Sequence, residues 1–261
     1  MAPHDSTDDR GVQDPRVAYD PNTQLYLMFY TCYNSGHVSN VSKAVLCLAT
    51  TKDPTDASGW LKRGVVFKGS SKSGALLIQE PPAAAAAAAG AAGVAAAAGA
   101  SLHHLYWGAG QIHITTSSDP TVWPLEGKPF ITKTAFEGWA VQNDGVESGP
   151  SPMRLSDGNY LFLHNSWSMN DTIYDSAGYQ PAWVIINGSD PTQIIARAPA
   201  PLWSPQKQPW MTGKAPWTCN VHNVAFLEAA HPTDKPDEFR VYFGGSDTVV
   251  GSAVITIHVP Q

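Results

Sequence analysis

The chain repeats one short phrase three times, and this repeat limits the folds that it can adopt. Each copy is an apolar or β-branched run that ends in a polar turn closed by Asp-Pro-Thr, at residues 53–55, 119–121 and 190–192. The aspartates of successive copies lie 66 and 71 residues apart. A period of this size indicates that one supersecondary unit is used several times. Turns of one kind between strands predict a radial or stacked β architecture.

Four strand-rich units can be marked along the sequence, beginning near residues 12, 73, 151 and 224. Each unit has the same order: a strand, a turn, an aromatic strand, a loop, and a strand that reaches an Asp-Pro turn or the chain end. Aromatic and β-branched runs between turn residues are typical of strands. The order suits the four-stranded blade of a propeller. We therefore expect an all-β fold in a single domain over residues 1–261.

Residues 83–100 interrupt the second unit between its first two strands. Fourteen of these eighteen residues are alanine, and the others are three glycines and one valine. Alanine favours helix, but the stretch has no polar face to solvate an isolated helix. We interpret it as a low-complexity insertion, or as a place where side-chain identities were not assigned. Neither interpretation gives it a function.

Composition and charge exclude several classes of function. The formal charge of −6 and the pI near 5.8 give no basic surface for nucleic acid. Apart from the alanine-rich residues 83–100, no run approaches the roughly 18 apolar residues of a membrane-spanning helix. The first nine residues are polar and acidic, so we expect no secretory signal and slightly favour the cytoplasm, with the compartment left open. A homo-oligomer is possible.

The three cysteines form no disulfide framework. Cys32 and Cys47 fall on what look like adjacent strands of a hairpin and could pair, which would leave Cys219 over. Because disulfides are rare in reducing compartments, the favoured expectation is that all three are buried free thiols.

A set of short phrases, in order and over nearly the whole chain, resembles those of one known family. The phrases are Gly-Val-Gln-Asp-Pro-Arg at 11–16, Ser-Gly-Ala-Leu-Leu-Ile at 73–78, Ile-His-Ile-Thr-Thr-Ser-Ser-Asp at 112–119, Gly-Pro-Ser-Pro at 149–152, Asp-Gly-Asn-Tyr-Leu-Phe-Leu-His at 157–164 and Val-Tyr-Phe-Gly-Gly-Ser-Asp at 241–247. In these phrases the chain resembles glycoside hydrolase family 130, five-bladed propellers that act on β-mannosides. The resemblance implies a five-bladed architecture of which four blades are visible here, so the chain looks short at its N-terminal end.

Two departures from the family pattern bear on the chemistry. In enzymes of the family, an aspartate just after the Tyr-Thr strand looks like the general acid, and the matching position here holds Asn34, whose amide cannot deliver a proton. Phosphorylases of the family carry an arginine in the second blade, but residues 105–108 contain none. Glu147 stands ahead of the Gly-Pro-Ser-Pro phrase, and in this the chain resembles the family's hydrolases, in which carboxylates replace phosphate ligands. A carboxylate at this place would repel phosphate. The balance favours hydrolysis.

Cleavage of a glycoside with inversion needs an acid on one side of the bond and a carboxylate that activates water on the other. The carboxylates that the motifs favour are Asp14, Asp144, Glu147 and Asp247. We expect Glu147 to be the base, with Asp144, three residues before it, as a further catalytic candidate. Asn34 occupies the place of the acid, while Asp14 and Asp247 would bind sugar hydroxyls.

The remaining candidates for sugar binding are basic or aromatic. They are Arg16, Lys72, His164 and His222, with Trp107 or Trp167 as a flat platform for a pyranose. No histidine has a convincing metal-ligand spacing, and no metal or cofactor is expected. The Asp-Pro-Thr turns are expected to be purely structural.

Three functions remain open at the level of the sequence. The favoured one is an inverting hydrolase of β-mannosides or related oligosaccharides. The second is a catalytically inactive carbohydrate-binding propeller, which the amide at Asn34 makes plausible. The third is a mannoside phosphorylase.

Overall fold

The computed structural model describes residues 8–36, 41–78, 102–125, 127–132, 144–168, 178–205, 209–212 and 221–258. All structural statements below concern these residues. The alanine-rich stretch at 83–100 and Cys219 lie outside them. No helix in the described ranges is long and apolar enough to cross a membrane.

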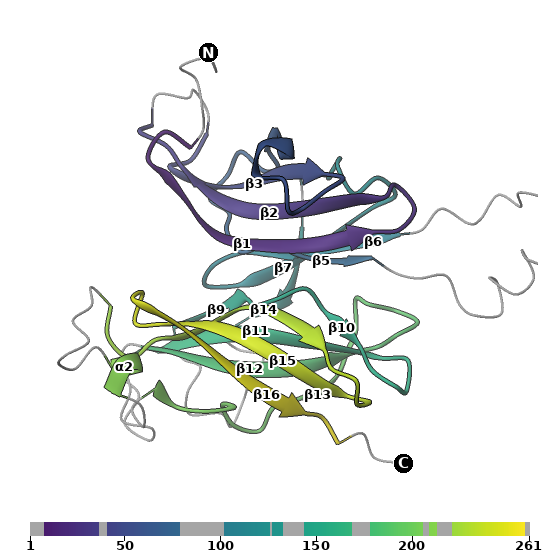
Figure 1. The fold of residues 1–261 in the computed structure, drawn as a ribbon, viewed down its shortest axis with the longest axis vertical. Helices are drawn as coiled ribbons and strands as arrows, with labels where there is room; N and C mark the ends of the chain where they lie inside the picture. Colours follow the sequence, from purple (N-terminus) through teal and green to yellow (C-terminus); the bar gives the residue numbers. More distant parts are fainter. Residues whose placement is uncertain are drawn as a thin grey trace, which may run out of the picture.

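The described chain is all-β and folds into four mainly antiparallel sheets that follow one another along the sequence (Figure 1). The first sheet holds β1 (Gly11–Asp20), β2 (Leu25–Tyr33), β3 (Ala44–Thr51) and β4 (Leu61–Val65). The second holds β5 (Ala75–Ile78), β6 (His103–Trp107), β7 (Ile112–Ser117) and β8 (Lys128–Ile131). The third holds β9 (Gly145–Ser148), β10 (Met153–Arg154), β11 (Tyr160–Ser168), β12 (Gly178–Ile186) and β13 (Ile194–Arg197). The fourth holds β14 (Ala225–Pro232), β15 (Glu238–Gly245) and β16 (Val249–Thr256).

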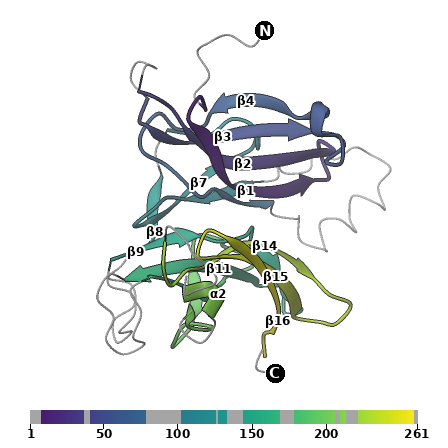
Figure 2. The ribbon, with the colours of Figure 1, turned by 60° about the vertical axis from the view of Figure 1, so that its left-hand side comes forward.

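The sheets are arranged as the blades of a propeller, with their first strands innermost. Strand β1 contacts both β5 and β14, so the inner strands of the first, second and fourth sheets meet. Figure 2 shows the first sheet with β1 as the strand nearest to the third and fourth sheets. This confirms the all-β fold and the four sequence units as a four-blade arrangement. The five-bladed architecture is not shown, because the described residues contain four sheets.

The third sheet has an inner strand in two pieces. β9 pairs with β11 from Ser148↔His164 to Gly145↔Trp167, and β10 pairs with the start of β11 at Met153↔Leu161. The residues between the two pieces are Gly-Pro-Ser-Pro at 149–152. Proline has no N–H to donate to a ladder, so the strand is interrupted there. The interruption begins two residues after Glu147, where β9 ends at Ser148.

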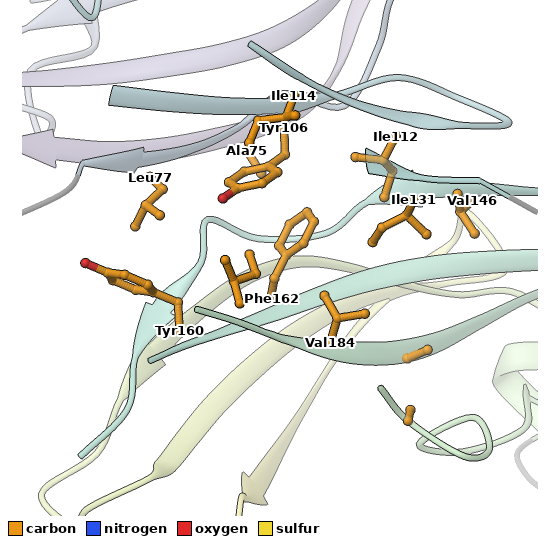
Figure 3. Packing of buried hydrophobic residues seen from close by; sticks show 13 residues of the cluster. Ala75, Leu77, Tyr106, Ile112, Ile114, Ile131, Val146, Tyr160, Phe162 and Val184 are labelled. Carbon is orange, nitrogen blue, oxygen red and sulfur yellow. The ribbon is translucent and has the colours of Figure 1, made fainter. Parts of the chain in front are cut away.

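Apolar clusters fill the spaces between successive sheets. Phe29 and Leu105 belong to the cluster between the first and second sheets, and Leu161 and Phe239 to the cluster between the third and fourth. Figure 3 shows the middle cluster, where Tyr106 and Phe162 point toward each other from the second and third sheets, with ring centroids 4.9 Å apart. Burying one such large side chain stabilises the fold by about 1.5–3 kcal/mol.

The three Asp-Pro-Thr turns make the same hydrogen bonds, as the repeat predicts. In each, one carboxylate oxygen of the aspartate accepts the main-chain N–H and the hydroxyl of the threonine two residues later. These bonds lower the pKa of Asp53, Asp119 and Asp190. The turns follow β3, β7 and β12, and their structural role is confirmed.

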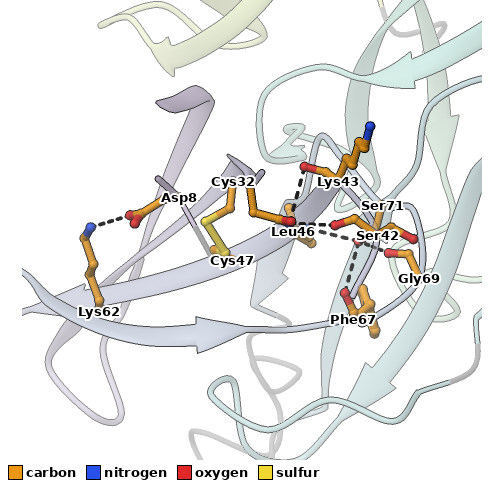
Figure 4. The surroundings of a disulfide bond; sticks show 11 residues. Asp8, Cys32, Ser42, Lys43, Leu46, Cys47, Lys62, Phe67, Gly69 and Ser71 are labelled. Atoms are coloured by element: carbon orange, nitrogen blue, oxygen red, sulfur yellow. Dashed lines mark hydrogen bonds and ion pairs between the residues drawn. A yellow bond between two sulfur atoms is a disulfide. The ribbon is translucent and has the colours of Figure 1, made fainter. Parts of the chain in front are cut away.

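Cys32 and Cys47 form a disulfide between β2 and β3 (Figure 4), so the expectation of free thiols is wrong for this pair. In the register of the hairpin, Cys32 lies opposite Val45 and Cys47 opposite Tyr30, which makes the two cysteines diagonal neighbours on one face. Their Cα atoms are 6.0 Å apart, within the usual range for a disulfide. The hairpin register thus brings the two cysteines within bonding distance, whichever compartment the protein occupies.

Candidate active site

A pocket of about 440 Å³ opens where the inner strands of the four sheets meet. All four sheets contribute charged side chains to its lining: Asp14 from β1, Lys72 just before β5, Glu147 from β9, Glu228 from β14, and Asp247 from the turn after β15. The aromatic side chains of Tyr179 and Phe226 complete one wall. Their rings meet edge to face, with centroids 5.2 Å apart. Four carboxyl groups and one ammonium group thus face a shared space.

Left-handed backbone is concentrated around this pocket. Among the described non-glycine residues with positive φ, five lie at or beside it: Asp14 (54°), Ser73 (54°), Asn223 (56°), Ser246 (49°) and Asp247 (54°). Such conformations cost about 1 kcal/mol or more outside glycine and tend to persist where the surrounding structure enforces them. At Asp14 the strain coincides with a register shift in β1 between Gln13 and Arg16. The shift allows both Gln13 and Asp14 to face the pocket.

Glu147 is the most tightly held carboxylate of the pocket. Its side chain is 4% exposed. The hydroxyl of Ser73 donates to Oε2 at 3.0 Å, and the hydroxyl of Tyr179 donates to Oε1 at 3.0 Å. One donor comes from the second sheet and the other from the third, so the carboxylate is fixed on both sides. Burial and the Glu147 charge raise the pKa of Tyr179, which keeps that phenol protonated as a donor.

Lys72 lies among carboxylates. Its Nζ is 3.9 Å from Oδ2 of Asp14 and lies over the ring of Tyr33, 5.9 Å from the centroid. Burial lowers the pKa of Lys72, but the charges of Glu147 and Asp14, together with Tyr33, outweigh it, and the net shift is upward. Among the described lining residues, Lys72 is the only lysine or arginine.

Asp247 lines the same pocket from the turn between β15 and β16. Burial and the Asp14 charge raise its pKa, and Lys72 lowers it by a smaller amount. Asp14, Lys72, Glu147 and Asp247 were all expected from the sequence to serve the site, and the fold brings these four together.

Arg16 lies behind the pocket and does not line it. Its side chain donates to main-chain carbonyls of Gly149 (Nε, 2.8 Å), Ser148 (Nη2, 2.7 Å) and Asp14 (Nη1, 2.8 Å). Nη1 also lies 3.4 Å from Oε2 of Glu228. Arg16 is 2% exposed. The sequence suggested that Arg16 binds the sugar. In the structure its side chain instead connects the first, third and fourth sheets.

Two of the proposed catalytic positions are not part of the pocket lining. The side-chain amide of Asn34 donates to the carbonyls of Ser42 and Lys43 at 2.7 and 3.4 Å, and its oxygen accepts the N–H of Gly36 at 2.8 Å. These bonds shape the β2–β3 connection. Asp144 immediately precedes β9, where its N–H donates to the carbonyl of Trp167 at 3.4 Å.

The two candidate histidines also lie outside the lining. His164 is fully buried in β11, where burial, with a smaller effect of Arg197, lowers its pKa to about 3. This is the environment of a neutral core histidine. His222 is exposed, with Nδ1 3.1 Å from the carbonyl of Thr212, although its neighbour Val221 lines the pocket. Neither Trp107 nor Trp167 lines the pocket, and the aromatic wall is Tyr179 and Phe226 instead.

Sequence reasoning missed Glu228 and Tyr179. Glu228 lies at a register shift in β14 between Leu227 and Ala229, where one extra residue breaks the alternation of faces. Its signal in the sequence was a single acidic residue within the apolar run Ala-Phe-Leu-Glu-Ala-Ala at 225–230. Tyr179 gave no comparable signal. No group of three or more potential metal ligands occurs in the described ranges, and no observation points to a metal.

The fold and the site together define the class of protein. It is a propeller-like ring of sheets with an acidic pocket at its inner strands. The chain belongs to glycoside hydrolase family 130, whose model, described as "beta-1,4-mannooligosaccharide phosphorylase", matches residues 1–259. The resemblance inferred from the motifs is thereby confirmed.

Individual relatives agree on the family and differ in the reaction that they are named for. The chain is 27% identical over 246 residues to a 1,2-beta-oligomannan phosphorylase of Thermoanaerobacter sp. (strain X514), which covers 94% of this chain and 68% of the relative. Two solved structures share the fold. One is a putative glycoside hydrolase from Bacteroides ovatus (TM-score 0.72, 22% identity, 95% of this chain and 70% of that one). The other comes from work on hydrolases within the family of mannoside phosphorylases that target β-1,2 mannosidic linkages in Candida mannan. Its TM-score is 0.73 at 21% identity, and the match covers 98% of this chain and 68% of that one.

Members of the family thus act on β-mannosides, as phosphorylases and in some cases as hydrolases. The name of the curated relative supports the phosphorylase alternative better than the hydrolase that the sequence analysis favoured.

Proposed function

We propose that this chain cleaves β-mannosidic bonds of oligosaccharides in the acidic pocket, by single displacement with inversion at the anomeric carbon. The observation that carries the proposal is Glu147, a buried carboxylate held by two hydroxyl donors at the wall of a pocket large enough for a sugar ring. Inverting cleavage requires a fixed carboxylate that takes a proton from the attacking group. The two donors leave Glu147 further lone pairs for this task.

The other charged groups of the pocket suit the hydroxyl groups of a sugar. Asp14 and Asp247 offer acceptors, and the ammonium group of Lys72, beside Asp14, offers donors. Tyr179 and Phe226 offer an apolar wall for the C–H face of a pyranose. The pocket is thus equipped to bind a neutral, hydroxyl-rich ligand.

Water is the attacking group that the pocket charge favours. Asp14, Glu147 and Asp247 face the same space as Lys72, the only cation of the described lining. A phosphate ion entering this space would meet several carboxyl groups and one ammonium group, and like charges repel. The specific observation in favour of phosphorolysis is the reaction for which the curated relative is named. We therefore retain phosphorolysis as the second candidate.

The test is incubation with β-1,2-mannobiose, with and without inorganic phosphate. Hydrolysis gives mannose in phosphate-free buffer, with the α-anomer appearing first by NMR because the configuration is inverted. Mannose 1-phosphate formed only when phosphate is present would instead establish the second candidate. Binding without turnover in either buffer would overturn both and leave a carbohydrate-binding propeller.

The variant Glu147→Gln separates the assigned base from a general requirement for the pocket. We expect it to lower kcat by at least about 100-fold, as loss of a general base typically does. The matched control is Glu238→Gln, which changes a glutamate at the start of β15, outside the pocket lining. Full activity of the Glu147 variant would show that another group activates the attacking molecule.

A further inference from the structure

We infer that Glu228 is the proton donor to the departing glycosidic oxygen. This inference rests on the proposed function, and it supplies the acid that the sequence could not locate. Asn34, at the position where the family resemblance places the acid, is an amide committed to the β2–β3 connection. A carboxyl group within the pocket must therefore take the role.

The backbone of β14 delivers Glu228 to the pocket. The register shift between Leu227 and Ala229 lets the side chain leave the normal alternation of the strand and join the lining. The amide of Asn165 in β11 fixes this point, because it donates to the carbonyl of Leu227 at 3.1 Å and accepts the N–H of Leu227 at 2.7 Å. Glu228 and Glu147 then line one pocket from the inner strands of two different sheets.

The surroundings of Glu228 favour its protonated form before the reaction. The side chain of Glu228 is 25% exposed, but its Oε2 is shielded from solvent and accepts no hydrogen bond from the described residues. The pKa of Glu228 is raised to about 8, chiefly by burial; Arg16 lowers it, the charges of Asp14 and Glu147 raise it, and Lys72 lowers it by less. These four charges face it from β1, from the segment before β5 and from β9. A carboxyl group that holds its proton at neutral pH can serve as a general acid.

Arg16 favours the form of Glu228 that the reaction produces. Its Nη1 lies 3.4 Å from Oε2 of Glu228, while three carbonyls hold the guanidinium in place. A carboxylate formed during proton transfer would therefore appear beside a fixed positive charge. Stabilising charge where it develops is the usual way in which a site lowers a barrier.

The step balances without a further reactant. Glu228 gives its proton to the glycosidic oxygen as the bond from that oxygen to the anomeric carbon breaks, with the bonding electrons going to the oxygen. A water molecule attacks the carbon from the other face and loses a proton to Glu147. Glu228 ends as the carboxylate and Glu147 as the acid, and exchange of a proton with solvent restores both.

The decisive comparison uses two substrates that differ in how much the departing oxygen needs a proton. β-1,2-Mannobiose needs one, whereas the dinitrophenolate of 2,4-dinitrophenyl β-mannoside leaves without it. We expect Glu228→Gln to lose at least about 100-fold in kcat/KM on mannobiose and less than about tenfold on the aryl mannoside. Glu238→Gln, as the matched control, keeps both activities. The assays are run with and without phosphate, so that the comparison holds for either attacking group.

Other outcomes would overturn the assignment in distinguishable ways. Suppose that the wild-type protein cleaves mannobiose. If Glu228→Gln then lowers kcat/KM equally on both substrates, or lowers it on neither, Glu228 is not the acid. Selective loss in Asp247→Asn instead would give that role to Asp247, the other pocket carboxyl whose pKa is raised. If the wild-type protein cleaves neither substrate, the proposed function itself fails.

A measurement that does not depend on activity tests the same point. In protein labelled with ¹³C at the glutamate carboxyls, one resonance should titrate near pH 8 and be missing from Glu228→Gln. If every glutamate carboxyl titrates below about pH 6, Glu228 holds no proton at neutral pH and the inference is wrong. The same spectra establish that the variant is folded.

Discussion

The guanidinium group of Arg16 donates a hydrogen bond of 2.7 Å to the main-chain carbonyl of Ser148, across the centre of the molecule. The two residues are far apart in sequence and belong to the inner strands of the first and third sheets. Ser148 directly follows Glu147, so the bond that joins two sheets also fixes the end of the strand that carries the proposed base. The integrity of the fold and the geometry of the site therefore depend on one side chain.

Replacing Arg16 by methionine should destabilise the protein by about 3–5 kcal/mol, because it leaves several buried carbonyls and the Glu228 carboxyl without their partner. Lysine should recover only part of this loss, since it lacks the planar array of donors. The measurement is urea unfolding, with the exposed Arg240→Met as the control. A loss no larger than that of the control would show that Arg16 is not a structural tie.

Removing either donor to Glu147 should lower turnover more than binding. Tyr179→Phe and Ser73→Ala each delete one hydrogen bond of 3.0 Å, so the carboxylate loses part of its fixed orientation. We expect kcat to fall about tenfold and KM to change little. Tyr19→Phe, outside this pocket, should behave as the wild-type protein. A change confined to KM would make these residues sugar ligands instead.

His164 should make the protein less stable in acid. Its pKa is lowered to about 3 in the folded state, against about 6.5 when unfolded, so only the unfolded chain binds a proton in between. The free energy of unfolding should therefore decline as pH falls from about 6.5 to 3, by about 1.4 kcal/mol per pH unit from this group. His164→Gln should show a correspondingly flatter pH dependence in denaturant titrations. Equal slopes in the two proteins would contradict the burial of a neutral imidazole.

The Cys32–Cys47 disulfide should be visible in a thiol titration. The sequence has three cysteines, so the unfolded, unreduced chain should react at no more than one thiol, and the reduced chain at three. The double variant Cys32→Ala, Cys47→Ala should lose about 2–4 kcal/mol in unfolding free energy. Three reactive thiols before reduction would show that the cysteines are unpaired.

The sequence predicted the repeated framework better than the site within it. The Asp-Pro-Thr turns could be predicted because each is made by local bonds between an aspartate and a threonine two residues later. Asp14, Glu147 and Asp247 could be proposed because they lie in or beside motif phrases, and all three line the pocket.

The positions that could not be predicted from the sequence share one physical cause, which is long-range geometry. Glu228 reaches the pocket through a bulge, which no periodic pattern announces, and Tyr179 reaches it from the second half of a hairpin. His164 ends an aromatic run in a motif, yet the sheet turns it toward the core. Arg16 is part of a motif phrase, but its partners are carbonyls that only the folded ring brings near.

The two ends of the blades differ in what they carry: one has the repeated turns and the other has the pocket. The register of each hairpin places the Asp-Pro-Thr turns at the end of the sheet away from Asp14, Lys72 and Glu147. The same two bonds between aspartate and threonine close all three turns, whereas the opposite end carries a different pocket residue in each sheet. A domain fused at such a turn would therefore lie at the rim away from the pocket. The scaffold can be extended at one rim while its chemistry is varied at the other.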